Sequence, residues 1–161
     1  MKQLVLKYLE LKCPPPIVMF VSAIIAMIIS QKNLAFIQQQ LTIVDNFIWP
    51  LFFLIAGIVV AIAGVKEFKD HQTTVNPIQP EKTTSLVTSG IYQFTRNPMY
   101  LGMLIVLLGW ADLLDSFLAY SGGLTFFLYI SAFQVKPEEE VMKDKFGQEF
   151  SQYCAQVRRW L

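Results

Sequence analysis

Uncharged stretches alternate with charged ones along the chain. Four apolar runs, over residues 17–30, 46–65, 98–111 and 117–135, contain no aspartate, glutamate, lysine or arginine. A transmembrane helix needs about 20 predominantly apolar residues. The first run is short for a full span, and the preceding LVLKYLELK segment either lengthens it or lies in the membrane interface. The pattern predicts an all-α integral membrane helical bundle of about four transmembrane helices.

The links between the runs predict how the helices are arranged. Only a short segment containing Asp112 and Asp115 separates the third and fourth runs, so these two helices are expected to form a hairpin. Basic residues concentrate in the N-terminal segment, in the loop over 66–97 and in the C-terminal tail, whereas the first link has only Lys32. The positive-inside rule then makes both termini cytosolic. We expect an integral protein of the bacterial inner membrane.

The tail from Pro137 onward differs from the four runs. Its apolar residues recur every three to five positions, mostly four, which indicates an amphipathic helix; they are Val141, Met142, Phe146, Phe150, Cys154 and Val157. Gly147 interrupts this pattern and is expected to break the helix. The tail is predicted to cover the cytosolic mouth of the bundle.

Composition agrees with a membrane protein and excludes some functions. Charged residues make up 16% of the 161 residues, against about 25% in a typical soluble domain. The net charge of +1 gives no basic face for nucleic acid. Cys13 and Cys154 lack the spacing of metal ligands, so we expect no metal site.

The loop over 66–97 is where chemistry is expected. A structureless loop longer than about 15 residues is uncommon unless it is functional or disordered. Its last part reads LVTSGIYQFTRNPMYLG from Leu86 to Gly102. Taken alone, Arg96 is a membrane-interface anchor, Asn97 and Pro98 are a helix cap with proline at the first helical position, and Glu138 to Glu140 are favourable charges at a helix N-terminus.

In combination these residues form a more specific pattern. Gly-x-Tyr, then Arg-Asn-Pro-x-Tyr-x-Gly, then a helical hairpin, then Glu-Glu, and an aromatic tail ending in Arg159-Trp160 follow one another. This order resembles the isoprenylcysteine carboxyl methyltransferases and their bacterial relatives, which group with the phospholipid methyltransferases. The resemblance covers about 73–161.

The resemblance implies a membrane methyltransferase that uses S-adenosylmethionine on a lipophilic acceptor. The length permits one domain, so we expect a single domain over 1–161, with N-terminal helices over 1–65 and the cofactor-binding, catalytic portion over 66–161. The cofactor-binding residues that the resemblance implies are Tyr92, Arg96, Asn97, Pro98, Tyr100, Gly102, Glu138 and Glu139. Of these, Arg96, Tyr100 and Glu139 are also the expected catalytic residues, and the stretch Thr74, Asn76 and Pro77 is a second-tier candidate.

The pattern departs from the family at two positions. Many relatives have histidine where this chain has Asn97, which cannot titrate. Many also have arginine where this chain has Glu140, so Arg96 or a tail arginine would have to replace it. The sole histidine, His71, lies outside the motif and is expected to be a solvated loop residue.

Three alternatives stay open. The acceptor is a phospholipid or small amine instead of a carboxylate; the protein is a membrane reductase that uses NADPH; or it is a membrane scaffold without catalytic activity. Membrane lipids and a lipophilic small molecule are the expected partners. The sequence leaves the oligomeric state undetermined.

Overall fold

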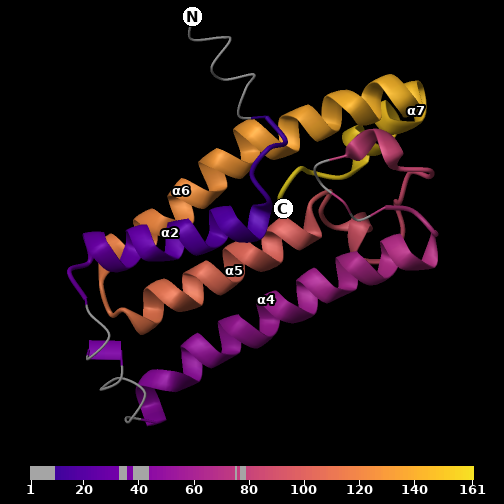
Figure 1. Cartoon of the computed structure of the whole chain (residues 1–161). Helices are drawn as coiled ribbons and strands as arrows, with labels where there is room; N and C mark the ends of the chain where they lie inside the picture. The colour runs from indigo at the N-terminus through magenta and orange to yellow at the C-terminus, as the bar shows by residue number, and fades with distance from the viewer. Residues whose placement is uncertain (1–9, 33–35, 38–43, 75, 77–78) are drawn as a thin grey trace, which may run out of the picture.

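The computed structural model describes residues 10–32, 36–37, 44–74, 76 and 79–161 (Figure 1). Within these ranges the regular structure is helical and contains no strand. The elements are α2 (Pro15–Ile29), α4 (Val44–Asp70), η1 (Pro80–Lys82), η2 (Gly90–Gln93), α5 (Pro98–Leu113), η3 (Phe117–Ala119), α6 (Tyr120–Ile130), η4 (Ser131–Val135) and α7 (Lys136–Gln156). The expected all-α class is therefore confirmed for the described part of the chain.

The long helices pack side by side as a bundle. Helix α5 packs against α4 and also touches α6 and α2, while α2 packs mainly on α6 (Figure 1). Two helical segments, Phe47–Asp70 and Phe117–Gln156, are long and apolar enough to cross a membrane. Helices α2 and α5 have 15 and 16 residues and rise about 22–24 Å, less than the roughly 30 Å of a bilayer core. Full spans at these two helices remain a prediction.

Glycines allow α4 and α5 to lie close together. A Cβ atom on Gly57 would come within 2.5 Å of the carbonyl oxygen of Gly102, and a Cβ on Gly109 within 2.6 Å of Phe53. Small residues permit such approach between membrane helices. The other side of α4 exposes large apolar side chains suited to lipid, among them Trp49, Phe52, Ile55, Val59 and Ile62.

The expected hairpin between the third and fourth runs is present. Helix α5 ends at Leu113, and the backbone N–H of Asp115 donates to the carbonyl of Asp112 at 2.9 Å. The short η3 turn then leads into α6, which returns along α5 (Figure 1). The two aspartates therefore lie at the turn, as their spacing predicts.

The structure differs from the prediction where the tail begins. Helix α6 continues into α7 through the π-helical turn η4, so the helix is not interrupted before Pro137. Proline has no N–H, and its ring would clash with the carbonyl of Phe133 in a regular α-helix; the wider π turn precedes it, and the Phe133 carbonyl accepts from the N–H of Leu11 instead, at 3.0 Å. The predicted break at Gly147 is confirmed, with φ of 53° and ψ of −117°.

Some predictions fall outside the described residues. They are the assignment of the segment before residue 10 to the interface or to the first helix, and the candidate role of Pro77.

Candidate active site

The loop before α5 is fixed against α4, the residues that follow it, and α7; Oγ of Ser89 donates to Oε2 of Glu67 on α4 at 2.5 Å. The N–H of Thr84 donates to Oγ1 of Thr73 at 2.9 Å, and Oγ of Ser85 donates to the carbonyl of His71 at 3.3 Å. From α7, Nζ of Lys145 donates to the carbonyl of Glu81 at 2.8 Å. The described part of this loop is thus an ordered layer at one end of the bundle.

A cavity of about 110 Å³ lies between this layer, the start of α5 and α7. One water needs only roughly 10–15 Å³ by the same measure, so the cavity suits a larger ligand. Its lining is largely apolar with a few polar groups, the usual composition of a small-molecule site. The lining residues used below are Phe68, Thr74, Asn76, Tyr92, Arg96, Asn97, Tyr100, Glu138, Glu139, Phe150 and Tyr153.

Most of the sequence-predicted residues meet at this cavity, although the motif segment and the glutamate pair are about 40 residues apart in sequence. The exceptions are Pro98 and Gly102, which lie against α4: a Cβ on Gly64 would be 3.0 Å from Pro98, and one on Gly102 would meet Ala61 at 2.9 Å. His71 is exposed and outside the lining, with Nδ1 2.8 Å from the carbonyl oxygen of Glu67.

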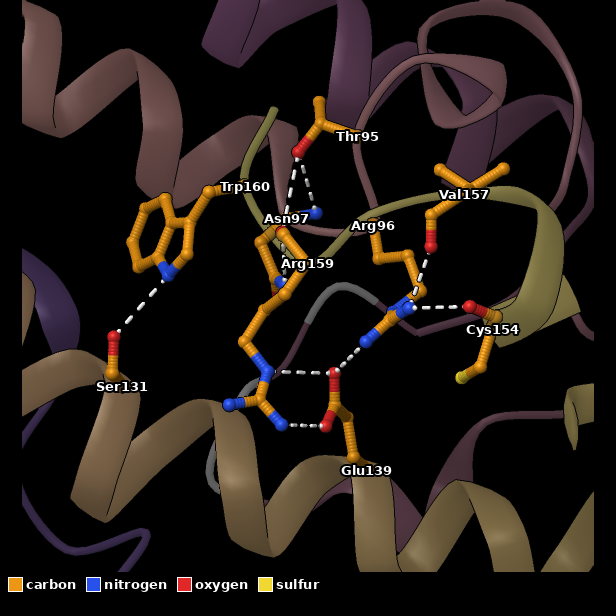
Figure 2. Close-up of polar contacts among 9 residues, drawn as sticks. All are labelled: Thr95, Arg96, Asn97, Ser131, Glu139, Cys154, Val157, Arg159 and Trp160. Atoms are coloured by element: carbon orange, nitrogen blue, oxygen red, sulfur yellow. Dashed lines mark hydrogen bonds and ion pairs between the residues drawn. The ribbon is translucent and has the colours of Figure 1, made fainter.

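Arg96 is held inside the protein instead of extending to solvent. Its side chain is 12% exposed, and Nη2 donates to Oε1 of Glu139 at 2.8 Å (Figure 2). Its Nη1 donates to the carbonyls of Cys154 at 3.2 Å and Val157 at 2.6 Å. The Nε atom is buried and has no hydrogen-bond partner among the described residues. This is the geometry of an ordered, buried guanidinium and not of a snorkelling anchor.

Glu139 is shared between two arginines. Arg159 donates from Nη2 to Oε2 at 2.5 Å and from Nε to Oε1 at 3.1 Å, on the side opposite Arg96 (Figure 2). Burial alone would raise the pKa of Glu139, but the hydrogen bonds and charges of Arg159 and Arg96 outweigh it and lower that pKa. Both oxygens of this ionised carboxylate are therefore occupied within the protein.

The segment over 157–160 holds Arg96 and Asn97 in place. The N–H of Arg96 donates to the carbonyl of Arg158 at 3.1 Å, and Nε1 of Trp160 donates to Oγ of Ser131 at 3.2 Å (Figure 2). Asn97 occupies the N-cap position of α5, but its side chain makes no capping hydrogen bond. Its Nδ2 donates instead to the carbonyl of Arg159 at 2.9 Å, because the tail offers a carbonyl acceptor beside it.

Glu138 has neutral partners, in contrast to its neighbour. Tyr100 donates from its hydroxyl to Oε1 at 2.5 Å, and Gln134 donates from Nε2 to the same oxygen at 2.7 Å. The apolar part of this helix ends at Val135, so Glu138 lies beyond it. Burial raises the pKa of Glu138 to about 7, although the two hydrogen bonds act in the opposite direction.

Aromatic rings form the remainder of the wall. The hydroxyl of Tyr153 donates to the carbonyl of Tyr92 at 2.7 Å, and the rings of Phe68 and Tyr92 lie 5.3 Å apart. With Phe150 and Val87 these residues form one apolar cluster that joins α4, the loop and α7. Burial raises the pKa of both Tyr92 and Tyr153, so both phenols are neutral at physiological pH.

Gln134 and Arg159 are among the residues at this site that were not singled out from the sequence as site residues. Gln134 lies four residues before Glu138, the spacing at which side chains on one helix meet. This spacing could have predicted the contact between Gln134 and Glu138 from the sequence. Arg159 was included only in the general expectation that a tail arginine would act. No sequence signal gives its contact with Glu139, which depends on how the tail folds back.

Comparison with known proteins identifies the family of the chain. A protein of Haemophilus influenzae described as uncharacterized is 44% identical over 63 residues, which are 39% of this chain and 100% of that protein. No solved structure matches the chain significantly. The sequence profile of the phospholipid methyltransferases matches residues 45–149, which include α4, α5, α6 and the glutamate pair. The chain belongs to the phospholipid methyltransferase family.

Proposed function

We propose that the protein is an S-adenosylmethionine-dependent methyltransferase that acts on a lipophilic acceptor at the cytosolic membrane face. The observation that carries this proposal is Glu138, a carboxyl on the cavity wall that no arginine or lysine pairs with among the described residues. Such a group favours a cationic ligand. Membership of the family supports a methyl transfer reaction.

The residues around the cavity fit the cofactor. Glu138 offers a carboxylate to its ammonium group, and Tyr92 and Phe150 offer ring faces to its adenine or to its sulfonium. The unpaired Nε of Arg96 is a buried donor at the same cavity, and a buried donor without a partner suggests a missing ligand or water. Glu139 holds Arg96 in place, so its role in this proposal is to position Arg96.

When bound, S-adenosylmethionine supplies an electrophilic methyl group on a positively charged sulfur. The contribution of this chain is to position the reactants and to keep water away from them. The apolar cluster around Phe150 and Tyr153 excludes water, while Tyr100 and Gln134 fix the orientation of the Glu138 carboxyl.

The acceptor has two candidates. The sequence motif resembles that of isoprenylcysteine carboxyl methyltransferases, whose acceptor is a carboxylate that needs no general base, but it does not separate a carboxylate from an amine. Membership of the phospholipid methyltransferase family favours an amine of a phospholipid or similar molecule. In addition, a carboxylate acceptor would need a positively charged partner. Arg96 is the cation among the described lining residues, and it is already paired with Glu139.

Calorimetry on detergent-purified protein tests the proposal. S-adenosylmethionine and S-adenosylhomocysteine are titrated into the parent, Glu138→Gln and Glu140→Gln, with NADPH as a control ligand. Glu140 is exposed and adjacent, so it controls for the loss of one charge on the same helix. We expect binding by the parent and by Glu140→Gln, and a loss of at least tenfold in Glu138→Gln.

Two outcomes would overturn the proposal: no binding of either methyl cofactor by folded parent protein, or binding of NADPH in their place. The latter would support the reductase alternative.

To identify the acceptor, isotopically labelled methyl groups are followed from S-adenosylmethionine into membrane lipid extracts. A base-labile methyl ester identifies a carboxylate acceptor, and a base-stable methylamine identifies an amine.

A further inference from the structure

The two adjacent glutamates on α7 have opposite environments. Glu139 is ionised between two arginines, whereas the hydrogen bonds to Glu138 come from a phenol and an amide, both to Oε1. No hydrogen bond from a described residue is made to Oε2 of Glu138. This oxygen is therefore the acceptor that remains for a ligand in the cavity.

Gln134 lies at an unusual place in the helix. It is 2% exposed, among the most buried polar side chains described, and it belongs to the π-helical turn η4. Single π turns within longer helices are rare and often occur at functional sites. Burying an amide is costly unless it is hydrogen-bonded, and its hydrogen bond to Glu138 is short, at 2.7 Å.

We propose that Gln134 is a positioning residue that, together with Tyr100, fixes Oε1 of Glu138 and directs Oε2 to the ammonium group of the ligand. The inference rests on the proposed function for the identity of that ligand. Gln134 itself does not contact the ligand in this proposal. Its amide also stabilises the ionised form of Glu138, since a donor favours the charged carboxylate.

The groups that face Glu138 allow its titration to be isolated. Tyr100 on α5 and Tyr92 on η2 face it, and phenols ionise near pH 10, outside the range used below. On α7, Glu139 is already ionised because its pKa is lowered. Arg96 also lines the cavity and is positively charged throughout this range. Glu138 is therefore the titrating group of the cavity between pH 5.5 and 8.5.

The first test measures S-adenosylhomocysteine binding by calorimetry from pH 5.5 to 8.5. The variants are Gln134→Leu and Gln134→Met, with Gln148→Leu as the control, because Gln148 is an exposed glutamine beyond the break at Gly147. In the parent, affinity falls on acidification as Glu138 takes up a proton. In both Gln134 variants we expect the midpoint at higher pH, about tenfold weaker binding at pH 7, and a smaller difference at pH 8.5.

A purely structural role for Gln134 would reduce affinity equally at every pH, and that result would overturn the inference. A double-mutant comparison adds a second criterion. If Gln134 acts through Glu138, then Gln134→Leu has no further effect in a Glu138→Gln background. An additional loss of the same size in that background would also contradict the inference.

The second test needs no ligand and so separates this inference from the proposed function. The infrared carboxyl band that is missing in Glu138→Gln is followed with pH in ligand-free parent and Gln134→Met. A higher midpoint in Gln134→Met supports the inference even if no methyl cofactor binds. An unchanged midpoint in folded Gln134→Met overturns it even if the cofactor binds the parent.

Discussion

Replacing Glu139 with glutamine removes the one negative charge that both Arg96 and Arg159 contact. The contacts join three parts of the structure: the segment before α5, the start of α7, and the tail that folds back beside them (Figure 2). Glutamine has nearly the same size, so the change acts on charge and hydrogen bonding, with little change in packing. The expected result is a substantial loss of stability without loss of the helical fold.

The magnitude follows from the exposure of each partner. Arg96 and Glu139 are 12% and 19% exposed. Leaving a buried charge without its partner costs about 3–5 kcal/mol, and we take the lower end because glutamine still offers an oxygen. Arg159 is 36% exposed, so its pair contributes less than about 1 kcal/mol. A total near 3 kcal/mol corresponds to a fall in Tm of roughly 10 °C for a chain of this length.

The assay is thermal unfolding in detergent, followed by the near-ultraviolet circular dichroism of the aromatic residues. Glu140→Gln is the control, since Glu140 is exposed on the same helix, and we expect its Tm within about 1 °C of the parent. Arg159→Gln is expected to lower Tm much less than Glu139→Gln. Equal Tm values for Glu139→Gln and Glu140→Gln would refute the reasoning, as would an Arg159→Gln effect as large as that of Glu139→Gln.

The same pair predicts a pH dependence. The pKa of Glu139 is lowered in the folded protein, so its stabilisation is complete above the ordinary carboxyl pKa of about 4.3 and is lost as pH falls through the lowered value. The difference in Tm between the parent and Glu139→Gln should therefore shrink on acidification below about pH 4. A difference that stays constant there would show that Glu139 does not act through its charge.

Four further substitutions, one of them a control, test other contacts. Gly57→Ala places a methyl group against the backbone of α5 and should lower the free energy of unfolding by about 1–3 kcal/mol. Gly123→Ala is the control: its methyl group would meet only ordinary contacts at 3.7 Å, and Tm should be unchanged. Gly147→Ala places a side chain on a residue with φ of 53°, which is a strained conformation for alanine. It should lower the free energy of unfolding by about 1–3 kcal/mol, measured by thermal unfolding. Trp160→Phe keeps a ring beside α6 but removes the 3.2 Å hydrogen bond to Ser131; it should cost about 1 kcal/mol, and no change would mean that this bond does not fix the tail.

The sequence predicted the helical elements well because each depends on local pattern. The charge-free runs matched α2 and α5 to within two residues at each end, Asp112 and Asp115 marked the hairpin turn, and Gly147 marked the kink. The continuous helix through Pro137 was not predicted. Proline usually ends a helix, and its accommodation here involves a π turn and a distant donor, Leu11.

The contents of the site were predicted better than its pairings. The motif and the glutamate pair were expected to meet, and the structure brings Tyr92, Arg96 and Tyr100 to one cavity with both glutamates. Adjacent residues on a helix point about 100° apart, so only one of the two glutamates can face the arginines directly. The Glu-Glu pattern in the sequence does not say which of them does so and which faces the ligand. Which of them contacts the arginines depends on where the tail returns, and that is a tertiary property with no local signal.

The return of the tail also determines when the site can exist during synthesis. Arg96 donates to carbonyls of Cys154 and Val157, which are made 58 and 61 residues later. At about 5–20 residues per second, a ribosome needs roughly 3–12 s to cover that distance. Throughout this interval Arg96 lacks these partners, although α4, which precedes it in the chain, has already been synthesised. A chain stalled before residue 154 would therefore contain α4, α5 and α6 but would lack the tail carbonyls that hold Arg96.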